Sequence, residues 1–132
     1  MKLSLSSLLF IASALLMFFG AFGFTFIVVP DLHGDLVEIG VRPTVLRGTV
    51  LHLYFAAFAM FGFAIMVSCA AIQALRGLRP ERCPLAIIAV IHIAFGLVAF
   101  SRSHNPHHLV ALGMGVLLAL ALVVPPSRRS ST

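Results

Sequence analysis

Four apolar runs separated by short polar segments make up most of the chain. They cover about residues 8–29, 47–72, 85–104 and 107–124. Each is close to the roughly 20 residues with which a helix, rising about 1.5 Å per residue, crosses a hydrocarbon layer about 30 Å thick. The short connections place successive helices antiparallel. The pattern therefore predicts an all-α membrane protein, with one domain over residues 1–132 folded as an antiparallel four-transmembrane-helix bundle.

The composition supports a membrane protein. Hydrophobic residues make up 61% of the chain and charged residues 10%, whereas soluble domains are roughly half apolar and a quarter charged. The formal charge of +5 does not indicate a nucleic-acid partner, because the nine basic residues are scattered through loops and tails. The predicted partners are the lipid bilayer and, within it, other membrane subunits or further copies of the chain.

Proline and glycine predict the boundaries of the first polar segment. The first span is predicted to end at Pro30, because the residue before a proline is pushed out of helical geometry. Residues 31–44 then carry three of the four acidic residues. Apolar residues are interleaved with the acids, which predicts a short helix along the membrane interface with Gly40 as its stop.

Prolines also mark the last two spans. Pro84 suits the first turn of the third helix, and the Asn105-Pro106 pair is predicted to close that helix and open the fourth. The tail of residues 125–132 is predicted to be disordered.

Small residues recur every fourth position along the fourth helix, a pattern that lets helix backbones approach closely in lipid. They are Ala111, Gly115 and Ala119, and Gly20 and Gly23 are expected to act in the same way on the first helix. The favoured interpretation is packing within one chain, with an interface between chains as the alternative.

The charges predict the orientation, because cytoplasmic segments of membrane proteins carry an excess of Lys and Arg. With the N-terminus inside, the inner segments carry six basic residues against three outside. The inner six are Lys2, Arg76, Arg79, Arg82, Arg128 and Arg129, and the outer three are Arg42, Arg47 and Arg102. Both termini are therefore predicted to be cytoplasmic, and the predicted location is a bacterial inner membrane.

With this orientation, five of the six histidines face the outer side, together with three acids. Imidazoles with carboxylates form an N/O ligand set that suits a divalent ion such as zinc, nickel or oxidised copper. The candidate metal ligands are His33, His52, His104, His107, Asp31 and Asp35. The alternative is an ordinary polar surface, in which the acids Asp31, Asp35 and Glu38 pair with the outer arginines.

His92 is the remaining histidine and is predicted to lie near the middle of the membrane. By residue counting, His52 and His104 share a level, and His92 lies about 18 Å below them. His52 and His92 therefore cannot be the two axial ligands of one haem. An ionisable group at mid-membrane depth is a candidate for function, and His92 with Met114 is a possible ligand pair for haem or reduced copper. The alternative is a structural histidine that receives a hydrogen bond from Ser13.

Three functions remain open from the sequence. The leading one is a small non-enzymatic membrane protein, an accessory subunit or small-ligand binder, that uses the His/Asp-rich outer face. The second is a protein that binds a divalent metal ion or haem, and the third is a membrane enzyme that acts on an apolar or lipid substrate with the outer His/Asp group as acid and base. The spans contain no acidic residue for a proton relay, and the chain has no glycine-rich phosphate loop, HExxH pair or GxSxG elbow. Cys69 and Cys83 have no CxxC spacing, so free thiols are expected.

Overall fold

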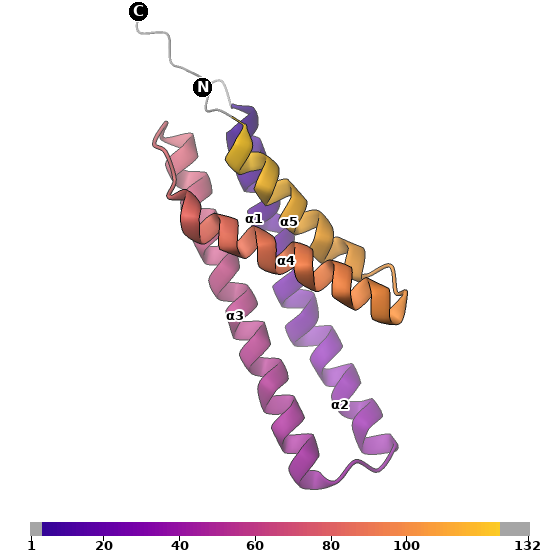
Figure 1. Ribbon diagram of the computed structural model, residues 1–132. Coiled ribbons are helices and arrows are strands. Elements are labelled where there is room, and N and C mark those ends of the chain that lie inside the picture. Colours follow the sequence, from indigo (N-terminus) through magenta and orange to yellow (C-terminus); the bar gives the residue numbers. More distant parts are fainter. Residues whose placement is uncertain (1–3, 125–132) are drawn as a thin grey trace, which may run out of the picture.

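The computed structural model describes residues 4–124, and within that range the chain is helical without strands (Figure 1). The elements are α1 (Leu5–Gly23), the π-helix η1 (Phe24–Val28), α2 (Val29–Glu38), α3 (Pro43–Leu75), α4 (Arg82–Ser103) and α5 (His108–Val123). The all-α prediction is confirmed. The predicted disorder of residues 125–132 concerns a segment outside the described residues.

Within residues 4–124, three helices are long and apolar enough to span a membrane. They are the continuous helix Leu5–Glu38 with 34 residues, α3 with 33 and α4 with 22. The fourth, α5, has 16 residues, so it extends only about 24 Å. That α5 crosses the membrane therefore stays a prediction.

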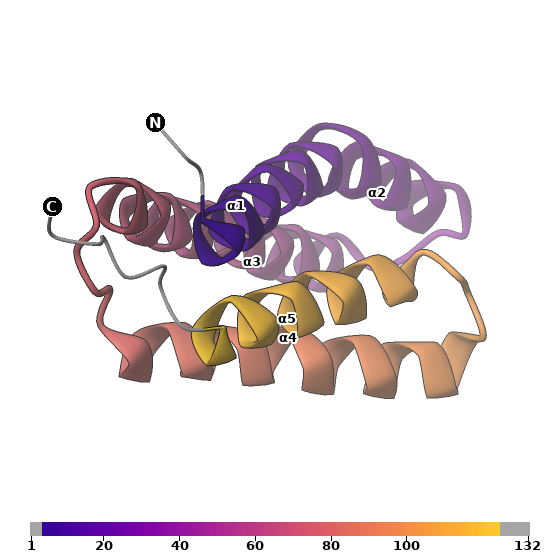
Figure 2. The same ribbon diagram turned by 90° about the horizontal axis from the view of Figure 1, so that it is seen from above.

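The helices form two hairpins of unequal length (Figures 1 and 2). The long hairpin pairs the continuous α1–η1–α2 helix with α3, and the short hairpin pairs α4 with α5. The hairpins join where α5 packs against α1, while α3 and α4 meet only briefly and then diverge. All four long segments contribute fully buried side chains, among them Met17, Val67, Ile88 and Leu118.

The first helix does not end at Pro30, so that prediction is wrong. The backbone changes from α to π geometry over Phe24–Val28 and then returns to α geometry in α2. The Val29 N–H donates to the Phe24 carbonyl, five residues back. Since proline lacks an N–H and its ring crowds the carbonyl four residues back, the wider turn lets the helix pass the proline without a break.

α2 is consequently an extension of the first helix rather than a separate interfacial helix. It ends near Gly40, which has a φ of 73°, a left-handed conformation that glycine adopts without steric cost. The stop at Gly40 is therefore confirmed. Because α3 is about 50 Å long and α4 about 33 Å, the long hairpin extends well past the short one.

Glycines bring α4 and α5 into backbone contact. A Cβ on Gly96 would lie 2.6 Å from the Leu112 nitrogen, and one on Gly115 would lie 2.7 Å from the Ala89 carbonyl oxygen. Gly115 therefore packs within the chain, as the favoured interpretation had it. On α1, Gly20 faces the Met114 side chain, whereas nothing lies within 4 Å of a Cβ on Gly23, so Gly23 does not act as expected.

The turn between α4 and α5 depends on the backbone of His104 and the side chain of Asn105, both in the Ser101–His108 segment. His104 adopts a left-handed φ of 52°, and its N–H donates to the Phe100 carbonyl, which ends α4. The Asn105 Oδ1 accepts the His107 N–H at 3.0 Å. α5 thus begins at His108, two residues after the predicted start at Pro106.

Candidate functional site

The projecting end of the long hairpin holds a groove of about 490 Å³. It is lined by His33 of α2 and by Pro43, Leu46, Arg47, Val50, Leu51 and Tyr54 of α3, and we call it the hairpin groove. The α3 residues fall at the three- and four-residue spacing that places side chains on one helix face. Pro43 stands in the first turn of α3, where its missing N–H costs no hydrogen bond.

The chemistry of the hairpin groove is amphipathic. Leu46, Val50 and Leu51 offer apolar contacts, while the Arg47 guanidinium and the Tyr54 hydroxyl can donate hydrogen bonds. No ion pair within 4.0 Å forms among residues 4–124, so the Arg47 charge has no carboxylate partner there. The volume lies in the range typical of small-molecule sites, about 300–1,000 Å³. The groove therefore suits a ligand with an apolar body and an anionic head.

The predicted metal ligands of the long hairpin do not gather around this groove. Only His33 lines it. The His52 Nδ1 lies 2.6 Å from the Gly48 carbonyl oxygen, a contact that makes Nδ1 the protonated nitrogen because a carbonyl only accepts. Asp31 and Asp35 are exposed on α2. No group of three or more His, Cys, Asp or Glu within residues 4–124 is arranged to hold a metal ion.

The other two predicted ligands, His104 and His107, lie in the α4–α5 turn. α2 approaches neither α4 nor α5, and the two hairpin ends lie apart along the long axis of the molecule (Figure 1). The predicted outer ligands do not come together. The residue count assumed that the helices run side by side, whereas α3 and α4 diverge. The His104 ring instead packs edge-on against Phe100 at 6.1 Å. The divalent-ion site stays a prediction, and the structure does not bring its ligands together.

His92 is buried, with 8% of its surface exposed. Its Nδ1 lies 2.9 Å from the Ile88 carbonyl oxygen of its own helix, and its ring packs edge-on against Phe63 of α3 at 5.9 Å. The expected hydrogen bond from Ser13 is not formed, because the Ser13 hydroxyl donates to the Leu9 carbonyl at 2.8 Å. Met114 packs between α5 and α1, where its Cε would be 2.7 Å from a Cβ on Gly20. These contacts account for both side chains without a cofactor, and the haem or copper site stays a prediction.

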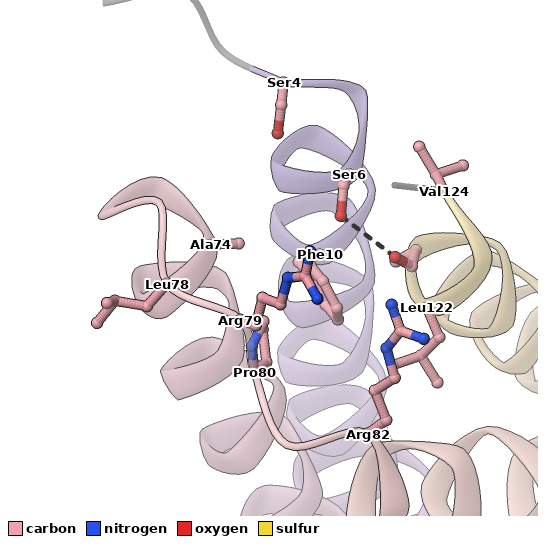
Figure 3. A pocket seen from close by; sticks show the side chains of 11 residues that line it. Ser4, Ser6, Phe10, Ala74, Leu78, Arg79, Pro80, Arg82, Leu122 and Val124 are labelled. Atoms are coloured by element: carbon pink, nitrogen blue, oxygen red, sulfur yellow. Dashed lines mark hydrogen bonds between the residues drawn. The ribbon is translucent and has the colours of Figure 1, made fainter. Parts of the chain in front are cut away.

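A second cavity lies at the opposite end of the bundle, where α1 begins (Figure 3). It has a volume of about 30 Å³, room for the centres of about two water molecules. Its lining residues are Ser4, Ser6, Phe10, Ala74, Leu78, Arg79, Pro80, Arg82, Ala121, Leu122 and Val124, and we call it the arginine cavity. From the sequence, Arg79 and Arg82 were predicted only to determine the topology. Their position at the start of α4 was visible, but the α1 and α5 walls were not.

No protein family, curated protein or solved structure matches the chain.

Proposed function

We propose that the chain is a four-span integral membrane protein that binds a small amphipathic acid in the hairpin groove, without catalysing a reaction. We place both termini on the cytoplasmic side of a bacterial inner membrane, so that the groove opens on the outer side. The observation that carries the proposal is the Arg47 guanidinium, which has no carboxylate partner among residues 4–124 and stands beside an apolar wall.

The position of the groove along α3 favours an amphipathic ligand. Counting about 30 Å, or roughly 20 residues, back from the end of α3 at Leu75 reaches Tyr54 and Phe55. Tyr54 therefore lies at the predicted hydrocarbon boundary, where tyrosine is enriched. Arg47 and Pro43 lie farther out, toward water. A ligand would direct its tail toward Leu51 and Tyr54 and its acidic head toward Arg47.

The groove carries its own spectroscopic reporter. Tyr54 is the single tyrosine, and the chain has no tryptophan, so tyrosine fluorescence comes from this site alone. The test is to titrate the full chain in detergent with a nitroxide-labelled long-chain carboxylate, which quenches nearby fluorophores, and with its methyl ester. Because a hydrogen bond to a charged group contributes roughly 1.5–3 kcal/mol, we expect the acid to quench at an about tenfold lower concentration than the ester.

A matched pair of variants separates the groove from general attraction of anions. Arg47→Gln should abolish the difference between acid and ester. Arg102→Gln removes the same charge from the α4–α5 end, which does not line the groove, and should preserve the difference. Equal quenching by acid and ester in the unaltered chain, or equal effects of the two substitutions, would refute the proposal.

A further inference from the structure

Two arginines line the arginine cavity, and neither has an acidic partner among residues 4–124. Figure 3 shows both guanidinium groups across the gap between α1 and α5, that of Arg79 beside Phe10 and that of Arg82 beside Leu122. No ion pair within 4.0 Å is formed in the described part of the chain, so Glu81, which lies between them in sequence, makes no close ion pair with either. Two positive charges thus converge on one small cavity.

Other features of the cavity add positive potential. α1 begins at Leu5 and α4 begins at Arg82, and residues at both N-terminal ends, Ser4 and Ser6 for α1 and Arg82 for α4, line the cavity. The first N–H groups of a helix have no acceptor within the helix and carry partial positive charge. α4 has no side-chain cap, whereas Ser4 caps α1 by accepting the Ser7 N–H at 3.1 Å.

The walls of the cavity are held in place by contacts between helices. The Ser6 hydroxyl donates to the Ala121 carbonyl oxygen of α5 at 3.2 Å, and Phe10 below it is 2% exposed. Leu78, in the turn between α3 and α4, also lines the cavity. Its side chain is 56% exposed and points outward in Figure 3. The cavity therefore combines the buried Phe10 side chain, two arginine side chains and the exposed apolar side chain of Leu78.

We propose that the arginine cavity binds the phosphate group of a phospholipid in the leaflet at this end of the bundle. Two planar guanidinium forks match the several oxygens of a phosphate, which they can bind in bidentate fashion. A cavity of about 30 Å³ admits phosphate oxygens and leaves the rest of the molecule outside. The cavity lies among the ends of four helices, α1, α3, α4 and α5, which we place at the level of the lipid headgroups, and the exposed Leu78 offers a contact for the acyl chains.

The test uses the full chain in a non-ionic detergent and native mass spectrometry, which counts bound lipid molecules. The probes are dilauroyl phosphatidylglycerol, dilauroylglycerol, which has the same chains without phosphate, and inorganic phosphate as a competitor. We expect one phosphatidylglycerol to be retained, dilauroylglycerol to be lost, and inorganic phosphate at millimolar concentration not to displace the lipid. Displacement by inorganic phosphate would overturn the lipid as the source, and equal retention of both lipids would overturn the phosphate site.

Variants in one turn give a matched control. Arg79→Gln and Arg82→Gln should each weaken retention about tenfold, since a charge-assisted hydrogen bond is lost. Arg76→Gln removes an equal charge from the same turn, outside the cavity lining, and should change retention less than twofold. Equal effects of the three substitutions would show attraction by net charge only and overturn the site.

Lysine variants test whether weaker lipid binding by the glutamine variants comes from the lost guanidinium group rather than from misfolding. Arg79→Lys and Arg82→Lys keep the charge and remove the guanidinium fork. We expect intermediate weakening with an unchanged circular dichroism spectrum. Full retention by both lysine variants would overturn the proposed bidentate geometry.

Discussion

The α4–α5 contact and the projecting end of the α2–α3 hairpin differ in how closely their two helices pack. Between α4 and α5, Gly96 and Gly115 remove side chains, and the backbones come close enough to exclude even a methyl group. Between α2 and α3, large side chains remain and a groove of about 490 Å³ stays open. The short hairpin is therefore closely packed, whereas the long hairpin leaves a groove in which we propose that a ligand binds.

The difference also bears on stability. Helix association in lipid relies on close van der Waals packing, because lipid tails are as apolar as the side chains. Substitutions at the α4–α5 contact are therefore expected to lower the free energy of unfolding the most. Substitutions at the projecting end are expected to change stability less and to change ligand binding instead.

The first prediction concerns the side of the membrane on which each hairpin ends, and its outcome is all or none. In a chain whose native cysteines are replaced by serine, Ile39→Cys and Asn105→Cys should both react with a membrane-impermeant maleimide in intact cells. Native Cys83, exposed at the start of α4, should react only after permeabilisation when tested with Cys69→Ser. Labelling of position 39 without position 105 would mean that the two hairpins do not end on the same side.

The second prediction addresses the close contact. Gly96→Ala and Gly115→Ala should each lower the free energy of unfolding by about 1–3 kcal/mol, because the added methyl groups meet backbone atoms. Unfolding in SDS followed by circular dichroism measures the loss. Gly113→Ala on the same helix meets nothing within 4 Å and should be neutral or stabilising by up to about 1 kcal/mol; a loss equal to that of Gly115→Ala would contradict the proposed close contact.

The third prediction addresses the tip of the long hairpin. Gly40→Ala should cost about 1 kcal/mol, because a Cβ disfavours the left-handed φ of 73°. The same SDS titration checks it. Gly34→Ala, inside α2 with open space around it, should show no loss, and a loss there as large as at Gly40 would argue against a strained turn.

The fourth and smallest effect concerns η1. Pro30→Ala restores an N–H, so the π-helix should revert to α geometry and turn α2 about its axis by roughly 100°, one residue of a helix with about 3.6 residues per turn. His33 would leave the hairpin groove, and the carboxylate probe should bind about threefold more weakly, the effect of one modest hydrogen bond. Tyr54 quenching measures the change, and unaltered quenching would show that His33 does not contribute.

Local patterns in the sequence predicted the helices well and their arrangement less well. The apolar runs predicted the helical segments to within a few residues at most ends, and the spacing of Gly115 identified a buried contact, because both signals reside in neighbouring residues. Pro30 misled because a proline acts on the carbonyl four residues back, and a π turn can relieve that conflict without ending the helix.

The sites could not be predicted from the sequence, because they depend on which helices are in contact. The depth count that placed His52 and His104 together assumed parallel helices, whereas α3 and α4 diverge. The face of α3 that lines the hairpin groove could not be identified from the sequence, because a helix that is apolar on all sides shows no distinct buried face. Arg79 and Arg82 line one cavity together with α1 and α5 residues. The contact of α5 with α1 links residues more than a hundred positions apart, such as Ser6 and Ala121.

The shortness of α5 has a consequence for the surrounding lipid. A hydrophobic helix of 16 residues is about 6 Å shorter than the roughly 30 Å of an average hydrocarbon layer. In the proposed membrane, the bilayer thins beside α5 and keeps its full thickness beside α3, at a cost of a fraction of a kcal/mol per Å. If α5 spans the bilayer as predicted, the two flanks of the protein would impose different thicknesses on the annular lipids, which would favour its enrichment where membranes are thin.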